Sequence, residues 1–179
     1  MSSKTKYISA TAIGIALFVV LSLCLQVPVF ENYYLCLGYV AMAVYCYSFG
    51  TLSGTIVGVF GVILYCLLIS GLRGMPGWAL GNIVIGIALG TVFRVTRKCK
   101  RQWVKWALYG AAVIASTALG ILIVKSLTES LLYSQPMAVR IGKNIYAFVA
   151  DAVMLLVSLP ICALLHGYAK KLLPSVVRE

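Results

Sequence analysis

The feature that most constrains this chain is the length of its uncharged apolar runs. Asn32 to Leu72 are 41 consecutive residues without a charged side chain. A helix needs about 20 apolar residues to cross the hydrocarbon core of a bilayer, so this run is long enough for two crossings. Of the 179 residues 62% are hydrophobic and only 11% charged, against about 45–50% and about 25% in soluble domains. The composition excludes a soluble enzyme, a disordered chain and a conventional nucleic-acid-binding protein.

The uncharged runs predict a single all-α membrane domain, a bundle of six transmembrane helices over residues 1–179. Inside the 41-residue run we expect the helix break near Ser48-Phe49-Gly50. The first run, Tyr7 to Phe30, has 24 residues, which is too long for the core of a signal peptide, so we expect a retained helix. The predicted spans are residues 8–27, 32–48, 51–71, 78–93, 106–124 and 144–166.

The basic residues predict the orientation, because cytoplasmic loops carry an excess of Lys and Arg. The chain has 15 basic and 4 acidic residues, a net charge of +11. With both termini cytoplasmic, only Arg73, Lys125, Arg140 and Lys143 fall outside and every other cation falls inside. The basic loop Arg94–Lys105 is the strongest anchor, and it could also dock an acidic partner or an anionic lipid.

Three connections are then external: 28–34, 72–77 and 126–143. The last one is long and polar, which is typical of a binding loop or lid. Asp151 is the only charge well inside a predicted span, where a charge costs about 2.5–3.5 kcal/mol on insertion scales. We expect it either to serve function or to form a structural pair with Lys143 or Arg140.

Polar and aromatic side chains gather on the predicted external side. Some of the aromatics would serve only as interfacial anchors, but the amides Asn82 and Asn144 are poor anchors and favour a pocket for a small polar molecule. The predicted substrate-binding residues are Glu31, Asn32, Tyr34, Arg73, Trp78, Asn82, Arg140, Lys143, Asn144, Tyr146 and Asp151.

Small residues predict where helices approach each other closely. The glycines of the third span, from Gly50 to Gly61, are expected to pack inside the monomer. The first span carries an AxxxA step, Ala12 and Ala16, next to the overlapping pair Ala10 and Gly14. This face could contact another helix of the chain or a partner protein.

The sequence lacks the sets of residues that catalysis or metal binding would need. No span carries a pair of acids, so neither acid–base catalysis nor a metal cage has ligands, and we expect no enzyme, metal or cofactor. Six cysteines without a CxxC pair predict buried thiols. Ser53 and His166 invite comparison with rhomboid-type proteases, but Thr51 stands where their GxSG motif needs glycine. No phosphate-binding loop is present, so energised transport would need a separate ATPase.

The chain resembles the substrate-binding S component of energy-coupling factor (ECF) vitamin transporters, a branch of the ABC importers. The resemblance extends over nearly the whole chain. It rests on six short spans, the AxxxA step Ala12–Ala16, the stretch from Leu37-Gly38-Tyr39 to Gly58, and Gly142-Lys143-Asn144, which resembles the start of the sixth helix in the riboflavin-type branch.

The resemblance implies that the protein lies in the cell membrane of a prokaryote and captures a vitamin on the external side. It would dock through Ala12 and Ala16 onto a transmembrane coupling subunit driven by two ATPases, then topple in the membrane to release the vitamin inside. Asn82, Lys143 and Asn144 would touch the substrate.

Several ligands and functions stay open. Leu37-Gly38-Tyr39 lacks the acidic residue often found there in the riboflavin-type branch, and the external cations suit pantothenate, followed by a pyridoxine-like compound, a pyrimidine or riboflavin. A self-sufficient channel or proton-coupled transporter using Asp151 is the alternative function, and an intramembrane serine protease is a minor one.

Overall fold

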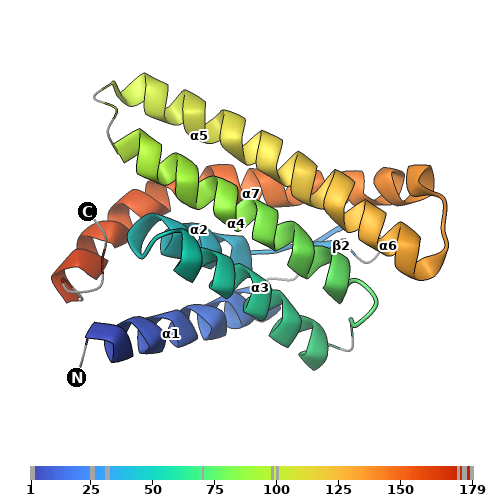
Figure 1. The fold of residues 1–179 in the computed structure, drawn as a ribbon, viewed down its shortest axis with the longest axis horizontal. Helices are drawn as coiled ribbons and strands as arrows, with labels where there is room; N and C mark the ends of the chain where they lie inside the picture. Colours follow the sequence, from blue (N-terminus) through green and yellow to red (C-terminus); the bar gives the residue numbers. More distant parts are fainter. Residues whose placement is uncertain are drawn as a thin grey trace.

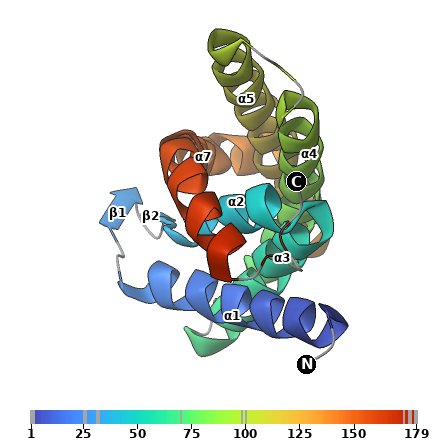
Figure 2. The ribbon, with the colours of Figure 1, turned by 90° about the vertical axis from the view of Figure 1, so that its left-hand side faces the viewer.

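Helical segments run back and forth along one axis, and both termini lie at the same end of the bundle (Figures 1 and 2). The computed structural model describes residues 3–24, 27–30, 33–69, 71–97, 99, 101–172, 174 and 177, without the side chains of 3, 27–30, 33, 34 and 97. The helices are α1 (Ser3–Cys24), α2 (Gly38–Ser48), α3 (Thr51–Leu68), α4 (Met75–Arg97), α5 (Gln102–Thr117), the π-helical η1 (Ala118–Lys125), α6 (Ser126–Tyr133) and α7 (Met137–Leu172). Because α5, η1 and α6 follow one another as one rod, the described residues form six helical segments.

Five of the described helical segments are long and apolar enough to cross a membrane: residues 4–24, 51–68, 75–96, 102–133 and 137–172. The sixth, α2, has 11 residues, or about 16 Å at 1.5 Å per residue, roughly half the thickness of the hydrocarbon core. It packs against α1, α3, α4 and α7 in the middle of the bundle. The chain therefore contains a buried half-length helix among longer ones.

The break between α2 and α3 lies where it was predicted. Gly50 adopts φ 97° between Ser48 and Thr51, a conformation that side chains with a Cβ rarely adopt. The first turn of α3 packs closely on α2, since a Cβ on Gly54 would lie 2.1 Å from Cys46 Sγ. The glycines of α3 thus serve packing within the chain, as expected.

The predicted start of the second span is wrong. Residues 33–37 are not helical; instead β1 (Val27–Phe30) and β2 (Tyr33–Leu35) form an antiparallel hairpin, with Val27 opposite Leu35 and Phe30 opposite Tyr33. β2 contacts α7. The domain is therefore predominantly helical, with a small hairpin at the end of the bundle away from the termini (Figure 1).

The predicted long polar loop 126–143 is also wrong. Ser126–Tyr133 is helical and α7 begins at Met137, so only three residues connect the two helices, with Ser134 at φ 50°. Ser126 and Glu129 are buried within the bundle. Their polarity reflects a polar site inside the protein and not a solvent-exposed loop.

Candidate functional site

A chain of hydrogen bonds joins α2, α3 and α4 at the end of α2 nearest the hairpin. Trp78 Nε1 of α4 donates to the Tyr39 hydroxyl of α2 at 2.8 Å, and that hydroxyl donates to Asn82 Oδ1 at 2.8 Å. Asn82 Nδ2 donates to the Gly58 carbonyl of α3 at 2.9 Å. Tyr39 and Asn82 are completely buried. Unlike scattered anchors, these groups form one connected set.

Two buried charges border this set. Asp151 of α7 is 4% exposed and Lys125, at the end of η1, is 7% exposed. The Tyr39 hydroxyl is within hydrogen-bonding reach of Asp151, and Lys125 is the cation that acts on this carboxylate. The Lys125 ammonium also lies 5.9 Å from the centroid of a Trp78 ring. Buried charges are costly unless compensated, and these two compensate each other. We call Tyr39, Trp78, Asn82, Lys125 and Asp151 the inner polar cluster.

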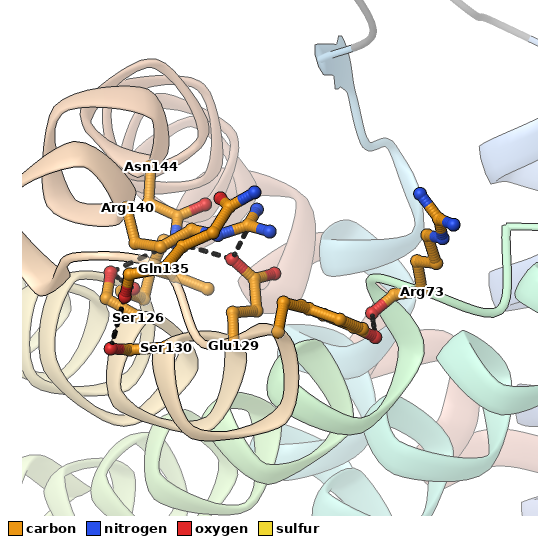
Figure 3. A network of polar contacts seen from close by, with 9 residues as sticks. Arg73, Ser126, Glu129, Ser130, Gln135, Arg140 and Asn144 are labelled. Carbon is orange, nitrogen blue, oxygen red and sulfur yellow. Dashed lines mark hydrogen bonds and ion pairs between the residues drawn. The ribbon is translucent and has the colours of Figure 1, made fainter.

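A second group, the outer polar cluster, joins α6 to α7 (Figure 3). Asn144 Nδ2 donates to Ser126 Oγ at 2.9 Å and to Glu129 Oε2 at 3.2 Å. Arg140 Nη1 forms an ion pair with the same Glu129 oxygen at 3.5 Å. The cluster comprises Ser126, Glu129, Arg140 and Asn144.

The two clusters are contiguous along one helical rod. Lys125 and Glu129 are four residues apart, so they share a face of the rod. The start of α4 packs closely on this face: a Cβ on Gly77 would lie 3.0 Å from the Lys125 carbonyl oxygen and 3.3 Å from Glu129 Cγ. The site therefore contains two cations and two carboxylates, each carboxylate beside one cation.

The structure brings together five of the predicted binding residues: Trp78, Asn82 and Asp151 in the inner cluster, and Arg140 and Asn144 in the outer one. The predicted pairing of Asp151 with Lys143 or Arg140 is wrong, because Arg140 pairs with Glu129 and Lys125 is the cation near Asp151.

Other predicted residues lie elsewhere. Arg73, Lys143 and Tyr146 are exposed, and the guanidinium of Arg73 points away from the outer cluster in Figure 3. The polar contact that the structure describes for Arg73 is made by its backbone carbonyl oxygen, which accepts a hydrogen bond from the Tyr133 hydroxyl. Glu31 and Asn32 are outside the described residues, as is the side chain of Tyr34, whose backbone pairs with Pro28.

Four residues of the two clusters were not predicted as site residues from the sequence: Tyr39, Lys125, Ser126 and Glu129. The available signal was the spacing of Lys125 and Glu129, which puts opposite charges on one face if the segment is helical. It was missed because Glu129 was assigned to a loop, residues 126–143, that begins just after Lys125. Tyr39 gave no signal, since a tyrosine in an apolar run is common in any membrane helix.

The small-residue faces of α1 have different environments. A Cβ on Gly14 would lie 2.6 Å from the Tyr45 ring, and Ala10 is buried, so this pair packs inside the chain. Ala12 and Ala16 are exposed. Their face of α1 has no partner helix among the described residues.

Neither Ser53 nor His166 is arranged for nucleophilic catalysis. Ser53 Oγ pairs with Thr11 Oγ1 at 2.9 Å, and His166 Nδ1 lies 3.3 Å from Ser48 Oγ. All six cysteines are free, and no group of three His, Cys, Asp or Glu in the described ranges could hold a metal ion. Burial raises the pKa of the Cys36 thiol, between β2 and α2, to about 12, so it is a neutral thiol.

These features define a polytopic membrane protein with a buried, charge-compensated polar site near one end of its bundle. A family model for the ECF-type riboflavin transporter S component matches residues 2–170, so the chain belongs to this family. The family consists of transporter subunits and not of enzymes, which agrees with the expectation from the sequence and contradicts the protease alternative.

Two curated relatives carry names without a stated activity. A UPF0397 protein of Lactococcus lactis subsp. cremoris (strain NZ9000) is 34% identical over 104 residues, covering 56% of this chain and 54% of that protein. The UPF0397 protein YdcD of Lactococcus lactis subsp. lactis (strain IL1403) has the same identity and coverage. The chain spans about half the length of the curated relatives it matches.

Proposed function

We propose that this chain is the substrate-binding subunit of an ECF transporter, which captures a small water-soluble vitamin at the hairpin end of the bundle. A coupling subunit and two ATPases would then drive its release inside. The observation that carries the proposal, together with the family match over residues 2–170, is the buried hydrogen-bonded set Trp78–Tyr39–Asn82, bordered by Lys125 and Asp151.

The position of this set supports a binding role. α2 occupies only the half of the bundle nearest the termini, and the hairpin Val27–Leu35 precedes it. Non-helical backbone at membrane depth is tolerated only where it is buried in protein or lines a cavity. Polar side chains at such depth are costly and mark substrate pathways more often than structural sites. The inner polar cluster is therefore our candidate for the vitamin site.

The sidedness follows from the charges. Arg94, Arg101, Lys105 and Lys171 lie at the end of the bundle that holds the termini. By the positive-inside rule this end is cytoplasmic, so the hairpin end and the inner polar cluster face the outside. A vitamin would enter from the external side.

The charge balance favours a vitamin without net charge. The cations that suggested pantothenate are not placed to bind the carboxylate of a ligand. Arg73 and Lys143 are exposed, and Arg140 already pairs with Glu129. An added carboxylate would unbalance the two cations and two carboxylates of the site, and uncompensated buried charge is strongly unfavourable. Riboflavin, a pyridoxine-like compound or a pyrimidine, with aromatic rings for Trp78 and polar edges for Asn82, fits better than pantothenate.

Calorimetric titration of the purified protein and two variants tests the site. Asn82→Leu removes an amide with both donor and acceptor, and we expect at least a tenfold loss of vitamin affinity, about 1.4 kcal/mol. Trp78→Phe, which keeps the ring and removes only the indole N–H, should lose less. Lys143→Ala, an exposed position on α7, should bind like the unmodified protein.

Two results would contradict the proposal. One is unchanged affinity in both cluster variants while Lys143→Ala loses binding. The other is vitamin uptake into liposomes by the chain alone, without ATPases, which would favour the self-sufficient transporter.

A further inference from the structure

A cavity lies at the opposite end of the bundle from the inner polar cluster. Its volume is about 200 Å³, and it is formed by the end of α4, the start of α5 and the region of α7 around Pro160. Pro160 is nine residues beyond Asp151, or about 13 Å along α7. Sites for drug-sized ligands occupy about 300–1,000 Å³, so this cavity is too small for a whole vitamin.

The lining of the cavity combines aromatic side chains with polar ones. Phe93 stacks on Tyr109 with ring centroids 5.2 Å apart, and both line the cavity with Trp106. Gln102 and the half-buried Lys105 line it at the start of α5. An apolar interior beside a cation suits a molecule with a hydrocarbon part and an anionic group.

α7 lines the cavity at a proline inside the helix. Pro160 has no amide hydrogen and cannot complete the helical hydrogen bond, so the helix bends there. α7 changes direction towards its C-terminal end in Figure 1, and Figure 2 shows α4 and α5 on the side of the molecule opposite α1, with the C-terminal end of α7 turning towards α1. Ala163, one turn after Pro160, also lines the cavity with its small side chain.

The electrostatics of this end call for an anion from outside the chain. No Asp or Glu occurs between Asn32 and Thr128, so α4 and α5 bring no carboxylate to Arg94, Arg101 or Lys105. The two described carboxylates, Glu129 and Asp151, both belong to the polar clusters near the hairpin. Charge complementarity therefore points to an anionic group of the surroundings, and in a bilayer this is a lipid phosphate.

We infer that this cavity binds one anionic phospholipid of the cytoplasmic leaflet, with its phosphate at Lys105 and the first part of an acyl chain against Phe93, Trp106 and Tyr109. Lysine binds phosphate as a point charge, and aromatic side chains are enriched at this depth of a membrane. Such a lipid would fix α5 against α7 where Pro160 separates them.

Native mass spectrometry of the full chain, released from nanodiscs with equal phosphatidylglycerol and phosphatidylcholine, tests the inference. We expect one retained phosphatidylglycerol per chain. Lys105→Glu reverses the charge at the cavity and Ala163→Phe fills it, so both should lower retention at least fivefold. Lys4→Glu makes the same charge change on exposed α1 at the same end of the bundle, and retention should stay unchanged.

Thermal unfolding in detergent gives a second readout and shows that each variant is folded. Added phosphatidylglycerol should raise the melting temperature of the unmodified protein and of Lys4→Glu, but not of the two cavity variants. Equal loss in Lys4→Glu and Lys105→Glu would overturn the inference, because attraction would then be diffuse. Equal retention of phosphatidylcholine, or equal stabilisation by inorganic phosphate, would overturn it as well.

Discussion

At the residue scale, each buried carboxylate that the structure describes has a cation acting on it. Glu129 has Arg140 as its partner and Asp151 has Lys125 nearby, and both carboxylates are almost fully buried. In a low-dielectric interior an unpaired charge costs far more than a compensated one. The pairs explain how an apolar bundle holds four charges close together.

The Glu129 pair gives a prediction at this scale. Glu129→Gln leaves Arg140 without its carboxylate, and we expect a loss of about 1.5–3 kcal/mol in the free energy of unfolding, as for a hydrogen bond to a charged group. The double variant Glu129→Gln with Arg140→Met should lose less than the sum of the two single variants. Denaturant unfolding in detergent measures the cycle, and strictly additive losses would contradict the pairing.

The site residues that could be predicted most directly from the sequence are polar residues inside apolar runs. Asn82, Asn144 and Asp151 interrupt apolar runs, where polar groups are costly, so the sequence alone marked them. Arg73 was predicted from its charge and place, and Lys143 also from the family resemblance; both proved to be exposed, because the sequence does not say which way a side chain near a helix end points. Tyr39 and Glu129 became recognisable only when the packing of α2 and α6 was known.

At the scale of elements, the inner polar cluster depends on a close crossing between α4 and the π-helical η1. A Cβ on Gly81 would lie 2.7 Å from the Gly120 carbonyl oxygen, and a Cβ on Gly120 would lie 2.8 Å from the Gly81 carbonyl oxygen. Both contacts are with backbone, which cannot move aside as a side chain does. The crossing sets the position of Lys125, five residues after Gly120, relative to Asn82, the residue after Gly81.

Gly120→Ala should therefore separate the two helices. We expect a loss of about 1–3 kcal/mol in stability from overpacking and weaker vitamin binding by calorimetry. Gly110→Ala is the matched control on α5, since its Cβ would meet only Leu156 Cδ2, at 3.9 Å. Alanine there should be neutral or slightly stabilising because of its better helix propensity. Equal effects of the two substitutions would contradict the role of the crossing.

The elements were predictable where the local signal was strong. Gly50 ended a helix as expected, because its backbone conformation favours glycine. The hairpin at Val27–Leu35 was not predicted, since valine, tyrosine and leucine in a short apolar run suit a strand and a membrane helix equally. The helix α6 was mistaken for a loop because two of its polar residues, Ser126 and Glu129, face a polar site and not water.

At the scale of the whole molecule, the two ends of the bundle differ in character. The hairpin end holds the polar clusters, and the end with the termini holds most of the described basic residues and the aromatic cavity. On the side of the bundle, the α1 face with Ala12 and Ala16 has no partner among the described helices. This arrangement suits a subunit that binds its ligand at one end and docks to a partner through α1.

The docking face gives a prediction for the complex. Ala12→Trp combined with Ala16→Trp should prevent close approach of a partner helix and weaken assembly with the coupling subunit and ATPases at least tenfold in co-purification. Vitamin binding by the isolated subunit should not change. Val153→Trp, on the exposed surface of α7, is the control, and equal assembly of all three proteins would contradict the proposed face.

The central claim is that the chain captures a vitamin without net charge at the hairpin end. The most direct test is calorimetric titration of the unmodified, purified protein with riboflavin, pyridoxine, a vitamin-derived pyrimidine and pantothenate in parallel. The account predicts saturable binding of one of the three neutral compounds, at least a hundredfold tighter than that of pantothenate. Tight binding of pantothenate, or of none of the four, would contradict it.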